Sequence, residues 1–223
     1  CGDLVNYQGY DYTTVQIDDQ CWFAENLRAE NYRNGEEIAF GDNSEAWINP
    51  QVGCAIAFGG YDAPYCQDFS PTIDACNPLI SVDYFGLLYN HLAVTDARRL
   101  CPIGWKVPAD SDWISLELFL GMSEDVVGDV GFRGTTEGQT IKTTLGWQNN
   151  GNGTDLVGFS GQPSGGISFE SGGFGNGGSD ANWWTSTEVG DEAWRRNLND
   201  YNNGIRRTTL NRSAGMSVRC IKD

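Results

Sequence analysis

The alternation of apolar and polar residues predicts short strands at both ends of the chain. Leu4–Tyr7 and Thr13–Ile17 alternate with a period of two, with a turn at residues 9–11 between them. We therefore expect these segments to pair as a hairpin, followed by the apolar stretch Gln20–Leu27. The tail, residues 183–223, repeats the pattern: strands are expected at 183–187, 193–198, 205–209 and 216–221, with turns at Gly190–Asp191, Asn202–Gly204 and Ala214–Gly215.

Two segments in the first half carry the spacing of helices, residues 85–99 and residues 108–121. The second has the clearer ends, because Pro108 and the caps Asp110–Ser111 precede it and Gly121 follows as a stop. The apolar positions at helical spacing are Leu88, Leu92 and Leu100 in the first segment and Trp113, Leu116 and Leu120 in the second. Helices followed by a meander of strands predict an α+β domain.

Two stretches show no sustained period. Residues 42–82 combine proline turns, glycines and three cysteines, and we interpret them as a long disulfide-stapled loop that leaves the core. Nine glycines lie between Gly158 and Gly178, so this stretch is not helical and predicts strand ends and open turns.

Length and composition favour one globular domain spanning residues 1–223. The chain has 39% hydrophobic residues, 29 glycines and a mean hydropathy of −0.41, and nothing in it resembles a linker. No apolar run approaches the roughly 20 residues that cross a bilayer, so no transmembrane segment is expected. The chain begins at Cys1, so an export signal has been removed or lies outside this sequence.

Seven cysteines without a CxxC pair, and a single His, argue against zinc and favour disulfides formed in an oxidising compartment. The predicted hairpin brings residue 1 opposite residue 20 or 21. The expected pairs are Cys1–Cys21, Cys66–Cys76 around a short loop, and Cys101–Cys220 between the middle of the chain and its last strand. Cys54 is left over, either buried or available for an intermolecular bond. We expect a secreted or cell-surface protein.

Charge is distributed unevenly. The last thirty residues hold seven of the 14 Lys and Arg residues and two of the 30 acidic residues, so they carry +5 in a chain of net charge −16. Aromatic, Asn and Arg residues interleave here, as they do in binding surfaces. The acidic body repels a polyanion and the cysteines indicate an extracellular location, so no nucleic acid partner is expected. Some arginines must point inward, and Arg219 is one that we expect to do so.

Catalytic chemistry has little support. His91, the single His, lies within a helix pattern, and no P-loop or dinucleotide fingerprint is present. The acids are too numerous to single out a catalytic pair, so a carboxylate-based glycosidase is the least favoured function. Calcium is the best metal candidate, because Asn152, Asp155 and Asp180 lie in loops rich in oxygen ligands. Turns need the same residue types, so both interpretations stay open.

Three groups of motifs stand out: Thr14–Ile17 with Trp22–Leu27, Leu100–Pro108 with Asp112–Trp113, and Trp183–Glu188 with Ser217–Cys220. Together they resemble the Fibrobacter succinogenes major paralogous domain, a family of secreted or surface bacterial modules. The resemblance covers nearly the whole chain apart from residues 42–82, and the combination of motifs is specific.

The middle and final motifs also look like the C-type lectin-like fold, in the form shared with formylglycine-generating enzymes and the variable proteins of diversity-generating retroelements. This resemblance implies that the terminal strands display a ligand-binding surface. The sequence departs from calcium-dependent lectins, because Gln162–Ser164 lacks the acid of their EPN or QPD triplet and no WND occurs. Cys220 is the one cysteine in the tail, so the cysteine pair of formylglycine chemistry is missing too. What the resemblance implies is a binding scaffold.

We therefore expect a non-catalytic, secreted or cell-surface module that binds a glycan or protein through its C-terminal strands and loops. The alternative is a structural subunit of an extracellular assembly such as a surface layer, filament or adhesin, which packs against copies of itself. The expected binding face consists of Trp184, Glu188, Trp194, Arg196, Asn199, Tyr201, Asn202, Arg206 and Thr208, while Trp22 and Trp183 are expected in the core.

Overall fold

An eight-stranded mixed sheet runs through the structure, a computed structural model that describes residues 1–61 and 77–223. Its three longest strands, β12, β13 and β14, are antiparallel neighbours near one end of the sheet. The order of its strands is β5 (Ala39–Phe40), β6 (Cys54–Ala57), β7 (Leu87–Tyr89), β15 (Met216–Ser217), β12 (Asp180–Val189), β13 (Glu192–Asn199), β14 (Asn202–Asn211) and β9 (Gly131–Arg133).

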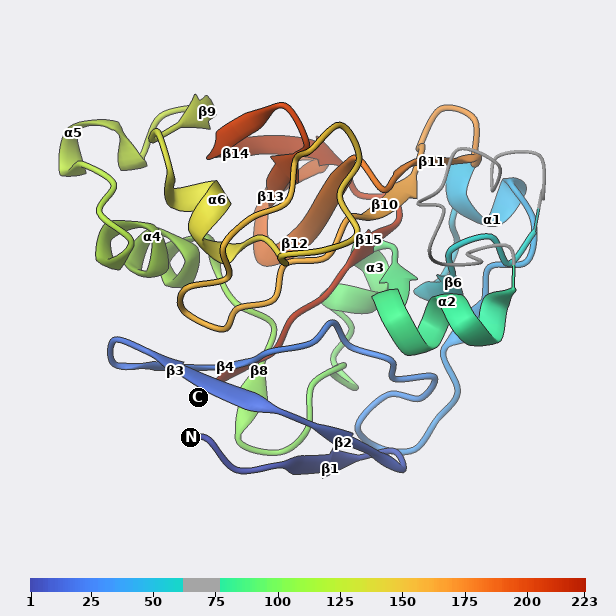
Figure 1. Ribbon diagram of the computed structural model, residues 1–223. Helices are drawn as coiled ribbons and strands as arrows, with labels where there is room; N and C mark the ends of the chain where they lie inside the picture. The colour runs from blue at the N-terminus through green and yellow to red at the C-terminus, as the bar shows by residue number, and fades with distance from the viewer. Residues whose placement is uncertain (62–76) are drawn as a thin grey trace.

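A four-stranded sheet and two hairpins complete the strands described. The small sheet has the order β3 (Thr14–Ile17), β4 (Gln20–Phe23), β16 (Ile221–Lys222), β8 (Trp105–Lys106), and the hairpins are β1 (Val5–Tyr7) with β2 (Tyr10–Tyr12) and β10 (Ser164–Ile167) with β11 (Phe174–Gly177). The helices are α1 (Glu45–Ile48), α2 (Pro78–Phe85), α3 (His91–Val94), α4 (Asp110–Phe119), α5 (Glu124–Val127) and α6 (Glu137–Ile141). Figure 1 shows the small sheet and β1–β2 below the large sheet, with α4 and α5 at one side and α2 at the other. The predicted α+β class is confirmed.

The opening hairpin pairs differently from the prediction. β1 pairs with β2 through a turn at residues 8–9, and the expected partner, β3, pairs with β4 instead. The prediction was wrong because Tyr10–Tyr12 also alternates, and the shorter connection from β1 to β2 costs less loop-closure entropy. The two hairpins still bring Cys1 to Cys21, and the disulfide between them is confirmed.

The helix expected at residues 85–99 is absent from the described structure. α2 ends at Phe85, Leu87–Tyr89 forms the buried strand β7, and a single turn, α3, follows. Gly86 separates α2 from β7 with φ +73°, and a side chain there would meet the backbone oxygen of Leu27 at 2.8 Å. Helical spacing misled because a strand buried on both faces is continuously apolar.

The second predicted helix is confirmed as α4. The side chain of Asp112 reaches back to accept a hydrogen bond of 2.7 Å from the backbone nitrogen of Ala109, which caps the first turn. Its buried face presents Trp113, Leu116 and Glu117 to the large sheet. Trp113 and Leu116 were predicted correctly for this face, Leu120 is only partly buried, and the burial of Glu117 requires the ion pairs described below.

Three of the four tail strands are confirmed as β12, β13 and β14. The turn at Gly190–Asp191 also forms as expected, because Val189 pairs with Glu192. The next turn lies at residues 200–201 instead of Asn202–Gly204, since Asn199 pairs with Asn202. The fourth strand is divided: β15 joins the large sheet and β16 the small one. The glycine-rich stretch provides β10 and β11, in agreement with its prediction.

Part of the segment 42–82 belongs to the core, which corrects its interpretation as a loop excursion. All four residues of β6 are buried, and β6 pairs antiparallel with β7. Trp47 and Phe58 are buried with it. Small apolar residues in a row, such as Cys54–Ala57, fit a strand that is covered on both faces.

The cysteines follow the predicted pairing where they are described. The Cys101–Cys220 disulfide closes over 119 residues and confirms the second expected pair. Cys54 is free and buried, and burial raises the pKa of its thiol to about 12, so it behaves as a small hydrophobe. The expected Cys66–Cys76 pair lies outside the described residues.

Aromatic side chains from distant segments meet between the two sheets. Trp22, Trp113, Phe159 and Trp183 are fully buried, and their neighbouring ring centroids lie 5.2–5.8 Å apart. The guanidinium of Arg219 lies 4.3 Å from the Phe159 ring, and burial lowers its pKa to about 9. The expected inward orientation of Arg219 is confirmed.

Candidate ligand-binding site

The inner face of β13 and β14 carries a buried ion-pair network against α4. Arg196 lies 2.7 Å from Asp110 and 2.5 Å from Glu117, while Arg207 lies 2.7 Å from Asp110. Arg133 of β9 contacts the second oxygen of Glu117 at 2.8 Å. Five charges therefore satisfy one another away from water, as buried charges must. The expected surface role of Arg196 is wrong, because its side chain is fully buried and paired.

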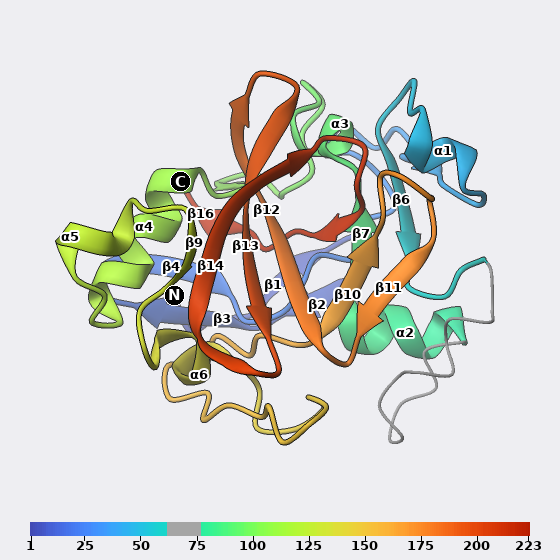
Figure 2. The ribbon, with the colours of Figure 1, turned by 90° about the horizontal axis from the view of Figure 1, so that it is seen from above.

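The outer face of the same strands points away from α4. Asn182, Asn197 and Arg206 pair across β12, β13 and β14 and so share this face, and Arg195 joins them by strand alternation. Hairpin β10–β11 borders it, since the Asn182 amide donates a 3.0 Å hydrogen bond to the Gly165 carbonyl. Figure 2 shows β14, β13, β12, β10 and β11 in this order across the molecule.

A cavity of about 390 Å³ lies on this outer face, between the three strands and the β10–β11 hairpin. Its size falls within the range of small-ligand sites. Charged, amide and apolar side chains all line it, among them Phe169, Asn176, Asp180, Asn182, Arg195, Arg206 and Leu210. We take this cavity as the candidate functional site.

Arg195 supplies a cation to the cavity. Its Nη1 donates to the side-chain oxygen of Asn182, and its buried Nε has no hydrogen-bond partner. The pKa of Arg195 is lowered to about 10, chiefly by burial and also by the nearby charge of Arg206, while Asp180 opposes both. Arg195 therefore stays protonated at neutral pH. Within the described ranges, neither Arg195 nor Arg206 makes an ion pair closer than 4.0 Å.

Asp180 is the carboxylate of the cavity. Its pKa is raised to about 6, chiefly by burial and also by the charge of Asp200, while Arg195, a hydrogen bond with Asn197 and Arg206 act in the opposite direction. The side chain is therefore ionised at pH 7.5 and mostly protonated at pH 5. The charge of the cavity consequently changes across this interval.

The cavity gathers few of the residues predicted for the face. Arg206 lines it, and Thr208 lies on the same face in register with Arg195. Trp184 is fully buried, donates from its indole nitrogen to the Tyr89 carbonyl at 2.9 Å, and is a core residue, so its expected surface role is wrong. Asn199 is buried as well, with 2% of its surface exposed.

The other predicted residues lie away from the cavity. Glu188, near the far end of β12, forms a 2.6 Å ion pair with Arg212. Trp194 lies on the side of the ion-pair network, where the guanidinium carbon of Arg207 is 3.5 Å from the centroid of the Trp194 ring. Tyr201 is 79% exposed in the β13–β14 turn, and the Asn202 carbonyl accepts a 2.9 Å hydrogen bond from Lys142.

Comparison with protein families gives a match over residues 15–222, to the Fibrobacter succinogenes major domain. The chain belongs to this family. No curated protein and no solved structure matches the chain. The match begins within β3 and ends within β16, so it includes both sheets, α4 and the candidate cavity of this Fibrobacter succinogenes major domain.

Sequence reasoning missed most residues of the cavity, among them Phe169, Asn182 and Arg195. Arg195 and Arg196 are adjacent, and strand alternation requires them to face opposite ways. Asp110 and Glu117 are seven residues apart, about two helical turns, and so lie on the same face of α4. This spacing was the available signal that one of the two arginines pairs with α4. Nothing in the sequence showed which arginine that would be.

The candidate calcium ligands of the domain make other contacts in the structure. The side chain of Asn152 accepts a 3.1 Å hydrogen bond from the Trp147 nitrogen, and Asp155 accepts from Ser160 at 2.7 and 2.8 Å. Asp180 lines the cavity instead. In the part of the chain that the structure describes, no group of three or more His, Cys, Asp or Glu side chains is arranged to hold a metal. Calcium binding stays a prediction.

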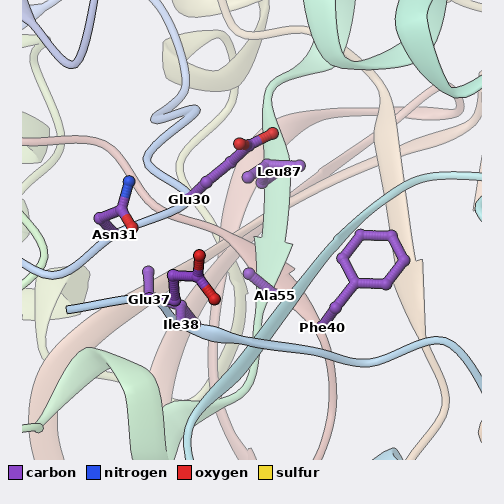
Figure 3. Close-up of a pocket in the computed structure, with 7 residues that line it drawn as sticks. All are labelled: Glu30, Asn31, Glu37, Ile38, Phe40, Ala55 and Leu87. Atoms are coloured by element: carbon purple, nitrogen blue, oxygen red, sulfur yellow. The ribbon is translucent and has the colours of Figure 1, made fainter.

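A second cavity, of about 250 Å³, lies beside the edge strand β5. Figure 3 shows Glu30 and Glu37 on one side of it and Phe40 on the other, with Ala55 and Leu87 between them. Both glutamates and Phe40 are exposed. Two carboxylates at one cavity make this the place at which the glycosidase alternative can be tested.

His91 occupies neither cavity. It is buried against Trp184, and its Nε2 lies 2.9 Å from the Thr185 carbonyl. Burial lowers its pKa to about 4, so the ring is neutral at physiological pH. It is a core residue. Separately, none of the described helices has the length and apolar character needed to span a membrane.

Proposed function

We propose that this domain is a secreted or cell-surface recognition module that binds a glycan or protein, without catalysis, on the outer face of β12–β14. The observation that carries the proposal is the cavity in which Arg195 and Arg206 lie without an ion-pair partner among residues 1–61 and 77–223. Desolvated cations cost free energy unless they are paired, so a protein keeps such a pair where a ligand completes it.

A C-type lectin-like fold belongs to the same proposal. Three features support it: the long antiparallel strands β12–β14, helix α4 packed behind them, and the disulfide that joins Cys101 to Cys220 beside the last strand. In such a scaffold the terminal strands form the ligand surface. The two disulfide bonds support an oxidising, extracytoplasmic location.

The test compares ligand binding by the wild-type domain and two variants on glycan and protein arrays. Arg195→Ala/Arg206→Ala is expected to weaken binding of the array ligand at least tenfold, because it removes both cations of the cavity. Lys222→Ala is the matched control, since Lys222 is an exposed basic residue of β16 outside the cavity. Binding by the double variant at wild-type strength contradicts the site assignment. The melting temperatures are measured in parallel to exclude unfolding.

Three further measurements separate the alternatives. Size-exclusion chromatography at micromolar concentration is expected to give a monomer, and polymerisation would favour the assembly subunit instead. Repeating the arrays with a calcium chelator tests the predicted cofactor. Glycan hydrolysis that is lost in Glu30→Gln/Glu37→Gln would establish the glycosidase alternative at the second cavity, whereas the proposal expects no hydrolysis by the wild-type domain.

A further inference from the structure

We propose that the cavity on the outer face binds the carboxylate of an acidic sugar, a uronate unit of a glycan, with Arg195 and Arg206 pairing with that carboxylate. The inference rests on the proposed function and specifies its ligand class. Asp180 and the polar groups of the β10–β11 side accept hydrogen bonds from the hydroxyl groups of the same sugar.

The charge of the cavity suits a monoanion. Two guanidinium groups and one ionised carboxylate, Asp180, leave a single net positive charge among the lining residues. Asp200 acts on the pKa of Asp180 but is not among the residues that line the cavity, and its side chain accepts a 2.7 Å hydrogen bond from Asn149. A uronate carboxylate matches this charge, whereas a phosphate dianion would face Asp180 with an uncompensated charge.

Geometry and desolvation favour a carboxylate over other acceptors. Guanidinium groups are planar and donate two parallel hydrogen bonds to a carboxylate. Arg195 is anchored at one end by Asn182, which orients its guanidinium before a ligand arrives. Arg206 is held over the Phe132 ring at 5.8 Å and lines the same cavity. An ion pair is stronger in such a partly desolvated site than in open water.

The remaining lining favours a sugar over an acidic peptide. Asp180, Asn176 and Ser168 offer acceptors and donors around the rim, which the hydroxyl groups of a sugar can satisfy. Phe169 and Leu210 add partly buried apolar surface for the carbon face of a ring. An Asp or Glu side chain of a peptide would offer the two arginines the same carboxylate, but it has no ring of hydroxyl groups attached to it for the rim.

Asp180 makes this binding depend on pH. The charged groups that act on it are Arg195 of β13, Arg206 of β14 and Asp200 in the β13–β14 turn. The pKa of Asp180 is raised to about 6, chiefly by burial, so its negative charge is largely lost at pH 5. A uronate with an ordinary pKa of about 3.5 stays ionised there. We therefore expect binding about three- to tenfold tighter at pH 5 than at pH 7.5.

Isothermal titration calorimetry with defined oligosaccharides tests the proposal. The probes are trisaccharides of galacturonate, glucuronate and mannuronate, each compared with its methyl ester, which keeps the hydroxyl groups and removes the charge. At least one uronate trisaccharide is expected to bind at least tenfold more tightly than its ester. Arg206→Ala is expected to remove this preference, Asp180→Asn to remove the pH dependence, and Lys222→Ala to change neither. The fourth variant is Arg195→Ala, which is expected to lose the uronate preference in the same way. If the Arg195→Ala protein does not fold, Arg206→Ala alone supplies this readout.

The outcomes separate this inference from the proposed function. Equal affinity for uronate and ester overturns the carboxylate inference while glycan binding stands. Binding of tetraglutamate in place of every uronate overturns it in favour of a protein ligand at the same site. If no ligand on the glycan and protein arrays binds the wild-type domain, the proposed function fails together with the inference. A uronate preference that survives in Arg206→Ala also overturns the assigned site.

Discussion

Adjacent arginines of β13 have opposite environments. Arg196 points inward, where Asp110 and Glu117 neutralise it, whereas Arg195 points outward into a cavity and keeps its charge unpaired. The difference arises from the twofold alternation of a strand, because neighbouring side chains leave opposite faces. Two residues of one type therefore serve stability and the proposed recognition separately. Asp180 interacts with Arg195 in the same cavity. Burial and the charge of Asp200 raise the pKa of Asp180, and the charge of Arg195 lowers it.

The pKa of Asp180 predicts how its removal affects stability. Its folded pKa of about 6 lies above the unfolded value of about 3.9. Ionisation of Asp180 therefore lowers the free energy of unfolding above pH 6, and the lost stability returns as the pH falls from about 6 toward 4. Asp180→Asn is expected to raise the free energy of unfolding by about 1 kcal/mol at pH 7.5, with little gain at pH 4. Thermal unfolding at both pH values measures it.

Asp19→Asn is the control for this prediction, because Asp19 is exposed in the β3–β4 turn. A lower stability of Asp180→Asn at pH 7.5 would show instead that attraction to Arg195 and Arg206 outweighs burial. The stabilised variant would also indicate that the carboxylate is kept for a reason other than folding, as active and binding sites often require.

At the level of elements, α4 and β13 are joined by charge as well as by apolar packing. Asp110 and Glu117 are seven residues apart, two helical turns, so both face the sheet and meet Arg196. Glu117 is fully buried and also pairs with Arg133, so it links α4 to two strands. The inner face of the sheet is thereby held against α4, while the outer face carries the cavity.

Glu117→Ala is expected to destabilise the domain by about 3–5 kcal/mol, because Arg133 and Arg196 would remain buried without a shared carboxylate. Urea unfolding at pH 7 measures the change. Glu170→Ala, at an exposed position between β10 and β11, is the control and is expected to change the free energy of unfolding by less than about 0.5 kcal/mol. A comparably small effect of Glu117→Ala would mean that water reaches the network.

At the level of the whole molecule, the C-terminal segment connects the two sheets. β15 pairs with β7 and β12 in the large sheet, and five residues of chain later β16 pairs with β4 and β8 in the small one. Arg219 and Cys220 lie between them, fully buried. The end of the chain therefore closes a core assembled from segments that are far apart in sequence.

The two disulfides are expected to contribute differently to the free energy of unfolding, because they join segments at different separations along the chain. Cross-linking Cys101 to Cys220 closes a 119-residue separation, and Cys1 to Cys21 closes 20 residues. The loop-entropy relation gives about 5 and about 3 kcal/mol respectively. Cys101→Ala/Cys220→Ala is therefore expected to lower the free energy of unfolding more than Cys1→Ala/Cys21→Ala. Guanidinium unfolding of both proteins measures this, and the reverse order would contradict the dominance of chain entropy.

Sequence patterns predicted most of the tail but little of the candidate site. β12–β14 and α4 were recognised because long alternating or helical patterns reflect one buried face. The helix expected at residues 85–99 failed at β7, where both faces are buried and no period remains. Among the cavity residues, Arg206 was anticipated, but Phe169 and Arg195 were not. The exposure of Phe169 and Arg195 depends on which segments cover each face of the sheet, and the sequence of a single strand does not contain this information.

The sequence by itself determined the family, the α+β class and the two described disulfides, because motifs, period and cysteine positions are local or countable properties. Only the tertiary structure decided which charges of the basic tail remain available. Arg196, Arg207 and Arg219 are buried in the interior, Arg212 pairs with Glu188, and Arg195 and Arg206 face the cavity. The physical reason is that burial and ion pairing depend on segments brought together by folding, such as α4 and β10–β11, which lie far from these arginines along the chain.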